Sequence, residues 1–343
     1  MNGTKVASAR LGPPLQQRAS VLEWTRGRDW VWPVVAVAGA FLPRVVTSPY
    51  LLGLLTSAVL LAIAAVGLGF LKKQCGLGMF GVAAFIGAPA YLLGIAAARF
   101  DLGTAVLLAF LGSTVFALLV GVFVVRARPL PFAMLTLALA QMLKSVVTLQ
   151  GLRPITGGDD GMSMIFDGSV FGLNQSDLSN VVSFWPMAWL ALCLVLIIAH
   201  FVDRSRLGHV LRAIQSNEER MRFSGFDTYL PRIAAFTIAS SIISISGILI
   251  ALNTAFASPE LLDFSTGGNS LVAMIVGGPG SLFGPVAGAL LYQFAQDAFG
   301  ATGHLTLFMG VALIVVVAAC PRGIAGLVAD AASRVQRFAR KRD

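Results

Sequence analysis

The chain has 343 residues, of which 57% are hydrophobic and only 12% are charged, and its mean hydropathy is +0.81. Soluble domains carry about 25% charged residues, so the composition excludes a soluble globular protein and indicates an all-α integral membrane protein. The net charge of +9 would suit nucleic-acid binding, but the basic residues flank apolar segments, which is the pattern of membrane topology instead. Three cysteines without paired spacing, Cys75, Cys193 and Cys320, indicate neither a disulfide framework nor a metal site.

The apolar segments predict about eight to ten transmembrane helices, two of them broken or re-entrant, at about 20 residues per crossing. They form one transmembrane domain, residues 30–327, between a basic N-terminal arm, 1–29, and a basic tail, 328–343. The arm has no apolar run followed by a small-residue cleavage site, so no cleaved signal peptide is expected. In chain order the apolar segments are 30–43, 50–71, 76–100, 103–125, 130–150, 181–202, 233–256, 269–278, 285–299 and 304–320.

The lysines and arginines orient these segments, because basic residues are retained on the cytoplasmic side. With both termini cytoplasmic, all but four of the 25 lysines and arginines lie in cytoplasmic segments. The four exceptions are Arg44, Arg99, Lys144 and Arg153. This topology places the loop 203–232 inside and the loop 151–180 outside, and it requires 269–299 to enter and leave on the outer side.

The loop 203–232 is the only long charged segment between two strongly apolar ones, and it holds six arginines. Within it Leu207, Val210, Leu211 and Ile214 fall on one face at helical spacing, and Gly225 supplies a stop. The pattern predicts a short amphipathic helix lying against the membrane face. It is either a docking site for a soluble partner or a solvated connector.

Ionisable residues are almost absent from the predicted spans. Lys144 lies toward the outer end of its helix, where it either snorkels to the interface or lines a pathway, and Asp297 is also near an outer end. No span carries a central Asp or Glu, whereas ion-driven carriers generally need buried carboxylates or unwound carbonyl sites. The sequence therefore argues for another energy source.

Uncharged polar stripes and glycine-broken segments are the remaining intramembrane features. Gln141, Ser145 and Thr148 share a helix face, with packing and a pathway role both open, whereas the hydroxyl stripe at 237–246 favours helix packing. Irregular backbone at membrane depth must be buried in protein or line a cavity, and short interrupted helices in transporters point at the substrate. Residues 76–91 and 269–285 are such a pair.

Six blocks of sequence, in this order, carry a resemblance to a known family. They are GLGMFGVAAFIGAPAY at 76–91, PFAMLTLALAQML at 131–143, TGGDDGMS at 156–163, LRAIQSNEERMRFSGFD at 211–227, SPELLDFSTGGNSLVAMIVGGPGSLFGPVAGA at 258–289 and PRGIAGL at 321–327. Together they resemble the LivM-like permease subunits of branched-chain amino acid ABC importers, over nearly the whole stretch 50–327.

The resemblance implies a permease that works with several partners in the bacterial inner membrane. These are a second homologous permease subunit, two cytoplasmic ATPase subunits, an extracytoplasmic solute-binding protein and membrane lipid, with no nucleic acid and no enzymatic activity or cofactor in this chain. ATP would be hydrolysed by the partners, since no GxxxxGK[ST] phosphate loop occurs here.

The resemblance also implies roles for particular residues. Glu219 and Gly225 match the glutamate and glycine of the importer loop signature, although Arg220 and Met221 replace its small residues. The expected ATPase-coupling residues are Arg212, Asn217, Glu218, Glu219, Arg220 and Gly225. The expected substrate-pathway residues are Gly76, Met79, Val82, Gly87, Gln141, Ser145, Asn269, Gly277 and Gly278. The expected docking residues for the binding protein are Thr156, Gly157, Gly158, Asp159 and Asp160, with a solvated connector as the alternative.

Departures from the family pattern bear on the substrate. Leu77, Met79 and Val82 stand where relatives typically carry a Gln, a Ser and a His, and Asn269 stands where many carry a glutamate. Pro89 replaces a usual glycine. These changes make the lining more apolar and less charged. The family that the chain resembles includes members assigned to urea, amides and aromatic acids, so the resemblance implies these as alternatives to a branched-chain amino acid. A secondary carrier and a membrane scaffold or sensor are the alternatives of another class.

Overall fold

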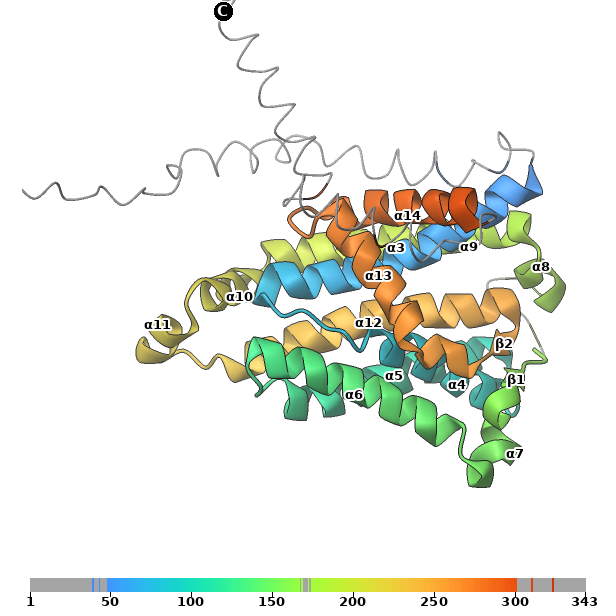
Figure 1. The fold of residues 1–343 in the computed structure, drawn as a ribbon, viewed down its shortest axis with the longest axis horizontal. Coiled ribbons are helices and arrows are strands. Elements are labelled where there is room, and N and C mark those ends of the chain that lie inside the picture. Colours follow the sequence, from blue (N-terminus) through green and yellow to red (C-terminus); the bar gives the residue numbers. More distant parts are fainter. Residues whose placement is uncertain are drawn as a thin grey trace, which may run out of the picture.

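The computed structural model describes residues 48–166 and 174–300, together with the single residues 39, 43, 168, 172, 310 and 323. Five of its helices are long and apolar enough to cross a membrane, which confirms the all-α membrane class (Figure 1). They are α3 (Pro49–Cys75), α5 (Leu102–Val124), α6 (Pro129–Val147), α9 (Val181–Arg204) and α12 (Tyr229–Thr254). Three shorter helices accompany them, α4 (Val82–Ala97), α13 (Phe264–Gly277) and α14 (Gly284–Gly300).

Several sequence predictions lie outside the described residues. These are the N-terminal arm, the tail, and the predicted spans 30–43 and 304–320, apart from the few single residues within them.

Helices α3 and α12 form the centre of the bundle. In their most apolar 18-residue windows 72% and 67% of the residues are buried, against 28% for α5, 22% for α6 and 33% for α9. Close contact between the central helices depends on glycine, since a Cβ on Gly67 of α3 would lie 2.9 Å from the carbonyl oxygen of Ala239 in α12. The peripheral helices thus expose wide apolar faces to lipid or to other subunits.

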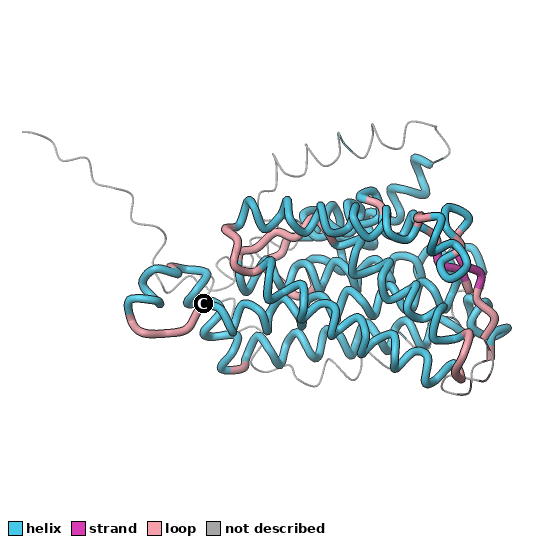
Figure 2. Tube along the Cα trace, turned by 90° about the horizontal axis from the view of Figure 1, so that it is seen from below, coloured by secondary structure: helices cyan, strands magenta, loops and turns pink. Residues whose placement is uncertain are grey.

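The two ends of the bundle differ (Figures 1 and 2). At one end, called here the α11 end, α10 (Arg206–Ser216) and α11 (Glu218–Phe223) follow α9, and α11 projects beyond the bundle. The opposite end, called the sheet end, carries a two-stranded antiparallel sheet of β1 (Met162–Ser163) and β2 (Phe256–Ala257). The short helices α7 (Arg153–Thr156) and α8 (Gln175–Ser179) lie there too, with 3₁₀ turns at Gln150–Leu152, Gly158–Asp160 and Pro259–Leu262.

The apolar segment 76–100, predicted to be broken by its glycines, is helical only over α4 and its flanking turn. Gly76 ends α3 in the left-handed conformation (φ 70°), residues 76–81 are not helical, and α4 then runs for 16 residues. The non-helical stretch passes against α6, where the Gly81 N–H donates to Thr136 Oγ1 at 3.3 Å. A Cβ at Gly81 would lie 1.9 Å from the Thr136 carbonyl oxygen, so only glycine permits this approach. The irregular backbone is therefore buried in protein, as a membrane requires.

Helices α13 and α14 pack side by side and both pack on α3. The Tyr50 hydroxyl, at the start of α3, hydrogen-bonds to Asp297 near the end of α14. The turn between the helices lies toward the α11 end, because Pro279 and Ser281 line a small cavity together with Lys73. The α13–α14 pair therefore leaves the sheet end and returns to it, which is the geometry of a re-entrant pair.

Candidate functional site

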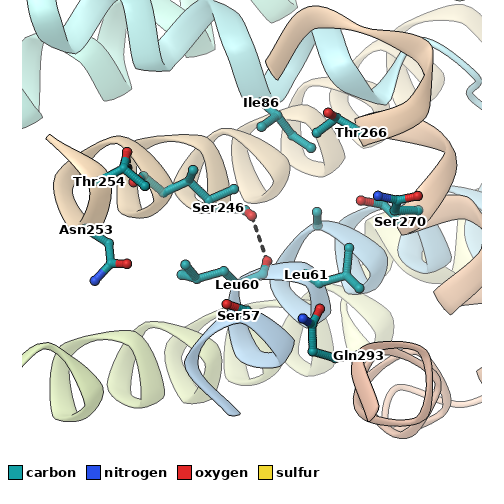
Figure 3. Close-up of a pocket in the computed structure, with 13 residues that line it drawn as sticks. Ser57, Leu60, Leu61, Ile86, Ser246, Asn253, Thr254, Thr266, Ser270 and Gln293 are labelled. Atoms are coloured by element: carbon teal, nitrogen blue, oxygen red, sulfur yellow. Dashed lines mark hydrogen bonds between the residues drawn. The ribbon is translucent and has the colours of Figure 1, made fainter. Parts of the chain in front are cut away.

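A cavity of about 230 Å³ lies between α3, α4, α12, α13 and α14 (Figure 3). It is called here the polar cavity after its many polar residues, although apolar atoms make up most of the surface that faces it. Eight of its thirteen described lining residues are polar but uncharged: Ser57, Ser246, Asn253, Thr254, Thr266, Asn269, Ser270 and Gln293. The apolar wall consists of Leu60, Leu61, Ala64, Ile86 and Ile250. None of the described residues that line the cavity is ionisable, so it suits a ligand without net charge.

The first turns of α13 supply three of the polar side chains. Asp263 caps this helix, accepting a hydrogen bond from the Phe264 N–H at 2.8 Å. Thr266, Asn269 and Ser270 then fall on one face at i, i+3, i+4 spacing. Of the three, only Thr266 lies in the first turn, where the helix dipole favours a negatively charged ligand group.

Two of these side chains retain hydrogen-bonding capacity. Ser270 is fully buried, and its hydroxyl has no hydrogen-bond partner among the described residues. Asn269 Oδ1 accepts from the Tyr292 hydroxyl at 2.7 Å, which fixes the amide and leaves its N–H groups for a ligand. An unpaired buried hydroxyl is costly, so a bound solute or water at Ser270 would stabilise the site.

Side chains of α12 both line the cavity and hold it together. Ser246 Oγ donates to the Leu60 carbonyl at 2.7 Å, which ties α12 to α3 (Figure 3). Asn253 Nδ2 donates to the Leu178 carbonyl at 3.3 Å, which leaves its Oδ1 as an acceptor. The arrangement can bind a small polar molecule with an aliphatic part, and the described residues contain no cluster that could hold a metal ion.

Only Asn269 among the predicted pathway residues lines this cavity. Met79 and Val82 are fully buried in the core, and a Cβ on Gly87 would meet Leu262 at 2.5 Å. Gly76 ends α3. Gly277 and Gly278 form the α13–α14 turn, where a Cβ on Gly277 would lie 1.9 Å from the Gly284 carbonyl oxygen. These glycines permit close backbone packing.

Gln141 and Ser145 are exposed on the lateral face of α6. Beside them Lys144 Nζ lies 3.1 Å from Asp263 Oδ2, with about a third of each side chain exposed. The Lys144 hydrogen bond holds the pKa of the Asp263 carboxyl below its usual value, and a hydrogen bond from Gln141 acts in the same direction. Lys144 thus has a specific partner, which the sequence did not indicate.

Of the other seven polar residues of the cavity, Ser246 belongs to the stripe predicted to pack helices, and sequence reasoning missed the remaining six. Their spacing was a usable signal, because 266, 269 and 270 share one face of α13, and 246, 253 and 254 share one face of α12 at i, i+7, i+8 spacing. Gln293 and Ser57 carried no such signal, since only the packing of α14 on α3 brings them to the cavity.

At the α11 end, the predicted amphipathic helix is confirmed as α10. Its Leu211 and Ile214 are buried, and the helix packs on α3 and α9. An ionic cluster around Asp203 fixes it: Lys73 Nζ lies 2.9 Å from Oδ2, and Arg212 Nη1 lies 2.6 Å from Oδ1. Gln74 Nε2 adds a hydrogen bond of 2.7 Å.

Helix α11 is a second, separate element, which the sequence did not predict. Asn217 ends α10 in an extended conformation (φ −163°, ψ 98°) and caps α11 by accepting from the Arg220 N–H at 2.9 Å. Glu219 and Arg220 are exposed. Phe223 is 91% exposed, an unusual state for a phenylalanine, and Gly225 then reverses the chain at φ 81°. The α11 tip is a surface suited to a protein partner.

The predicted docking turn at the sheet end is well ordered by its own contacts. Thr156 Oγ1 donates to the Val147 carbonyl at 2.7 Å, and Gly157 and Gly158 both adopt positive φ. Asp159 and Asp160 are both exposed, and Asp160 pairs with Arg153 at 2.8 Å. The turn therefore presents two carboxylates, one of them paired with an exposed arginine.

Comparison with known proteins agrees with this architecture. Residues 50–320 match the family described as branched-chain amino acid transport system, permease component. The chain is 26% identical over 314 residues to the high-affinity branched-chain amino acid transport system permease protein LivM of Salmonella typhimurium, covering 85% of this chain and 72% of that protein. Its identity to LivM of Escherichia coli K12 is 25% over the same shares.

A second type of permease from the same kind of transport system also matches. The LivH permease protein of Escherichia coli K12 is 24% identical over 206 residues, covering 58% of this chain and 67% of that protein. No solved structure matches the chain. Because the family match covers most of the transmembrane domain, the chain belongs to the permease components of branched-chain amino acid transport systems.

Proposed function

We propose that this chain, a multi-pass inner-membrane permease subunit of an ABC importer, binds a branched-chain amino acid or a related small solute in the polar cavity and is driven through α11. The observation that carries the proposal is that the cavity and the exposed α11 surface lie at opposite ends of the molecule. An uncharged polar cavity opens among α3, α12, α13 and α14, and a protruding helix with exposed charged and aromatic side chains lies at the opposite end.

The cavity chemistry supports a small zwitterion. The Asn269 N–H groups and the Ser270 hydroxyl can donate to the carboxylate, and the amide oxygens of Asn253 and Gln293 suit the ammonium group. The wall of Leu60, Ile86 and Ile250 suits an aliphatic side chain. Small amides are the second candidate, because a lining without ionisable groups serves a neutral ligand equally well. A ligand with net charge would need a compensating charge there.

The α11 surface is proposed as the contact for the ATPase subunits. Glu219, Arg220 and Phe223 project from it without being needed to pack the bundle. This orientation makes the α11 end cytoplasmic and the sheet end outer. The acidic turn with Asp159 and Asp160 would then face the solute-binding protein, and unchanged transport after replacing both aspartates with alanine would refute that role.

The lateral face of α6 is proposed as the contact for the second permease subunit. Gln141, Lys144 and Ser145 lie partly exposed in the last two turns of α6, and Lys144 pairs with Asp263, the cap of α13; polar groups on a spanning helix are costly where they face lipid. The face of α5 exposes Leu107, Leu111 and Val115 instead and suits lipid. Pairing of the permease subunits through α6 would cover the polar groups.

Reconstitution of the whole complex tests the proposal. In proteoliposomes holding this chain, the second permease and the ATPase subunits, we expect leucine or a related solute to accumulate only with ATP and binding protein. A panel of leucine, acetamide, urea and an aromatic acid, scored by stimulation of ATP hydrolysis, separates the substrate candidates. Uptake by this chain alone, driven by an ion gradient, would identify a secondary carrier and refute the proposal.

A further inference from the structure

We infer that the Glu218–Arg232 ion pair transmits movement of α11 to α12, the helix whose far end lines the polar cavity. The inference rests on the proposed ATP-driven function and identifies the side chains that connect the force to the site. Both are positioning residues, since neither lines the cavity.

The ion pair joins the start of α11 to the first turn of α12, so a movement of α11 would reach α12 through it. Glu218 Oε1, at the start of α11, accepts from Arg232 Nη1 at 2.9 Å, in the first turns of α12. The same oxygen accepts from Thr228 Oγ1, the residue preceding α12, at 3.4 Å. Arg232 is 8% exposed, and a charge so far removed from water does not give up its partner readily. The link is therefore stiff.

The connection between α10 and α11 is different in kind. Asn217 is extended between the two helices, so α11 can turn relative to α10 without breaking hydrogen bonds within either helix. Helix α10 is meanwhile fixed to α3 and α9 through the ionic cluster around Asp203. A displacement of α11 consequently has a direct side-chain route into α12.

Helix α12 carries the displacement to the cavity. From Arg232 to Ser246 it rises about 21 Å, at about 1.5 Å per residue, and Ser246, Ile250, Asn253 and Thr254 then form one wall of the cavity. Ser246 also bonds to the Leu60 carbonyl of α3 at 2.7 Å. Movement of α12 along or about its axis would strain this bond and change the wall facing the solute.

The experiment measures solute imported per ATP hydrolysed by the reconstituted complex. Glu218→Gln keeps the shape and removes the charge, and Arg232→Lys keeps the charge and alters the geometry. For Glu218→Gln we expect this ratio to fall about tenfold, within the usual range for coupling between sites, while assembly and ATP hydrolysis persist. Arg232→Lys should lower the ratio less.

Arg222→Gln is the matched control, because Arg222 Nη2 also contacts Glu218 Oε1 at 2.9 Å but its side chain is 67% exposed. Arg222 Nε also donates to Thr228 Oγ1 at 3.2 Å, so this variant removes the exposed contacts between α11 and the residue preceding α12 but keeps the buried Glu218–Arg232 pair. Exposed contacts contribute little, so the ratio should stay as in the wild type. A melting temperature for each variant separates loss of stability from loss of transmission. A purely structural role would lower the melting temperature without changing the import per ATP measured below that temperature.

Two results would overturn the inference. One is an assembled Glu218→Gln complex with the wild-type ratio. The other is a folded Glu218→Gln permease that no longer binds the ATPase, which would make Glu218 a contact residue. Failure of the wild-type complex to import with ATP would refute the proposed function itself, so the two failures are distinguishable.

Discussion

Asn269 is the residue at which the sequence prediction and the cavity coincide. Its amide is held by the Tyr292 hydroxyl at 2.7 Å, so its N–H groups have a fixed direction. For Asn269→Ala we expect the half-saturating solute concentration for transport to rise roughly fivefold, as for the loss of one hydrogen bond to a ligand. Tyr292→Phe should have a smaller effect, because the amide remains. An unchanged half-saturating concentration in Asn269→Ala would place the solute elsewhere.

A substitution at Gly81 tests how closely the non-helical stretch that connects α3 and α4 packs against α6. A Cβ there would lie 1.9 Å from the Thr136 carbonyl oxygen, so Gly81→Ala must displace α6 or the non-helical stretch. We expect a loss of stability of about 1–3 kcal/mol, seen as a lower melting temperature. Gly78→Ala in the same stretch is the control, because nothing lies within 4 Å of its Cβ position. Equal melting temperatures for the two variants would contradict the close contact between Gly81 and the Thr136 carbonyl oxygen.

The glycines show why residue roles were only partly predictable. A glycine that lets two backbones touch and a glycine that lines a cavity leave the same mark in the sequence, an interruption in an apolar run. Gly277 proves to be of the first kind, and Gly87 makes room for the Leu262 side chain instead of lining the cavity. The polar residues at 266 and 270 were visible in the sequence, but their common cavity depends on α3, α12 and α14, which lie far away in the chain.

At the scale of elements, α11 gives a direct test of coupling. Glu219 is exposed, so Glu219→Lys should leave the fold and melting temperature unchanged. We expect it to uncouple ATP hydrolysis from transport, because it reverses the charge on the surface proposed to meet the ATPase. Import per ATP hydrolysed is the measurement, and Glu260→Lys, exposed at the sheet end, is the control. Normal import by Glu219→Lys would count against α11 as the contact.

The break between α10 and α11 separates a helix that the sequence pattern predicted from one that it did not predict. Helical periodicity identified α10 correctly, because Leu211 and Ile214 do face the bundle. The separate α11 was missed although Asn217, followed by two glutamates, is a typical helix start. The Glu218–Arg232 pair was not predictable in this way, because the reversal at Gly225 brings its partners together.

For the whole molecule, the α6 face predicts how the permease subunits pair. With native cysteines replaced, Ser145→Cys should cross-link to cysteines scanned along the second permease, because this polar face is proposed to be covered by it. Leu111→Cys, 50% exposed on the apolar face of α5, should react with a lipid-soluble reagent and give no cross-link. Cross-linking from position 111 and not from 145 would assign the interface to α5.

The sequence by itself determined the membrane class, the membrane-spanning helices now described and the transporter family. These follow from composition, from apolar runs of fixed length and from ordered motifs, which are properties read along the chain. Only the tertiary structure decided that residues 76–81 are non-helical, that the polar cavity forms where it does, and that Lys144 and Arg232 have acidic partners. The physical reason is that a buried polar group is satisfied by whatever packing brings to it, and packing joins residues that no local pattern relates.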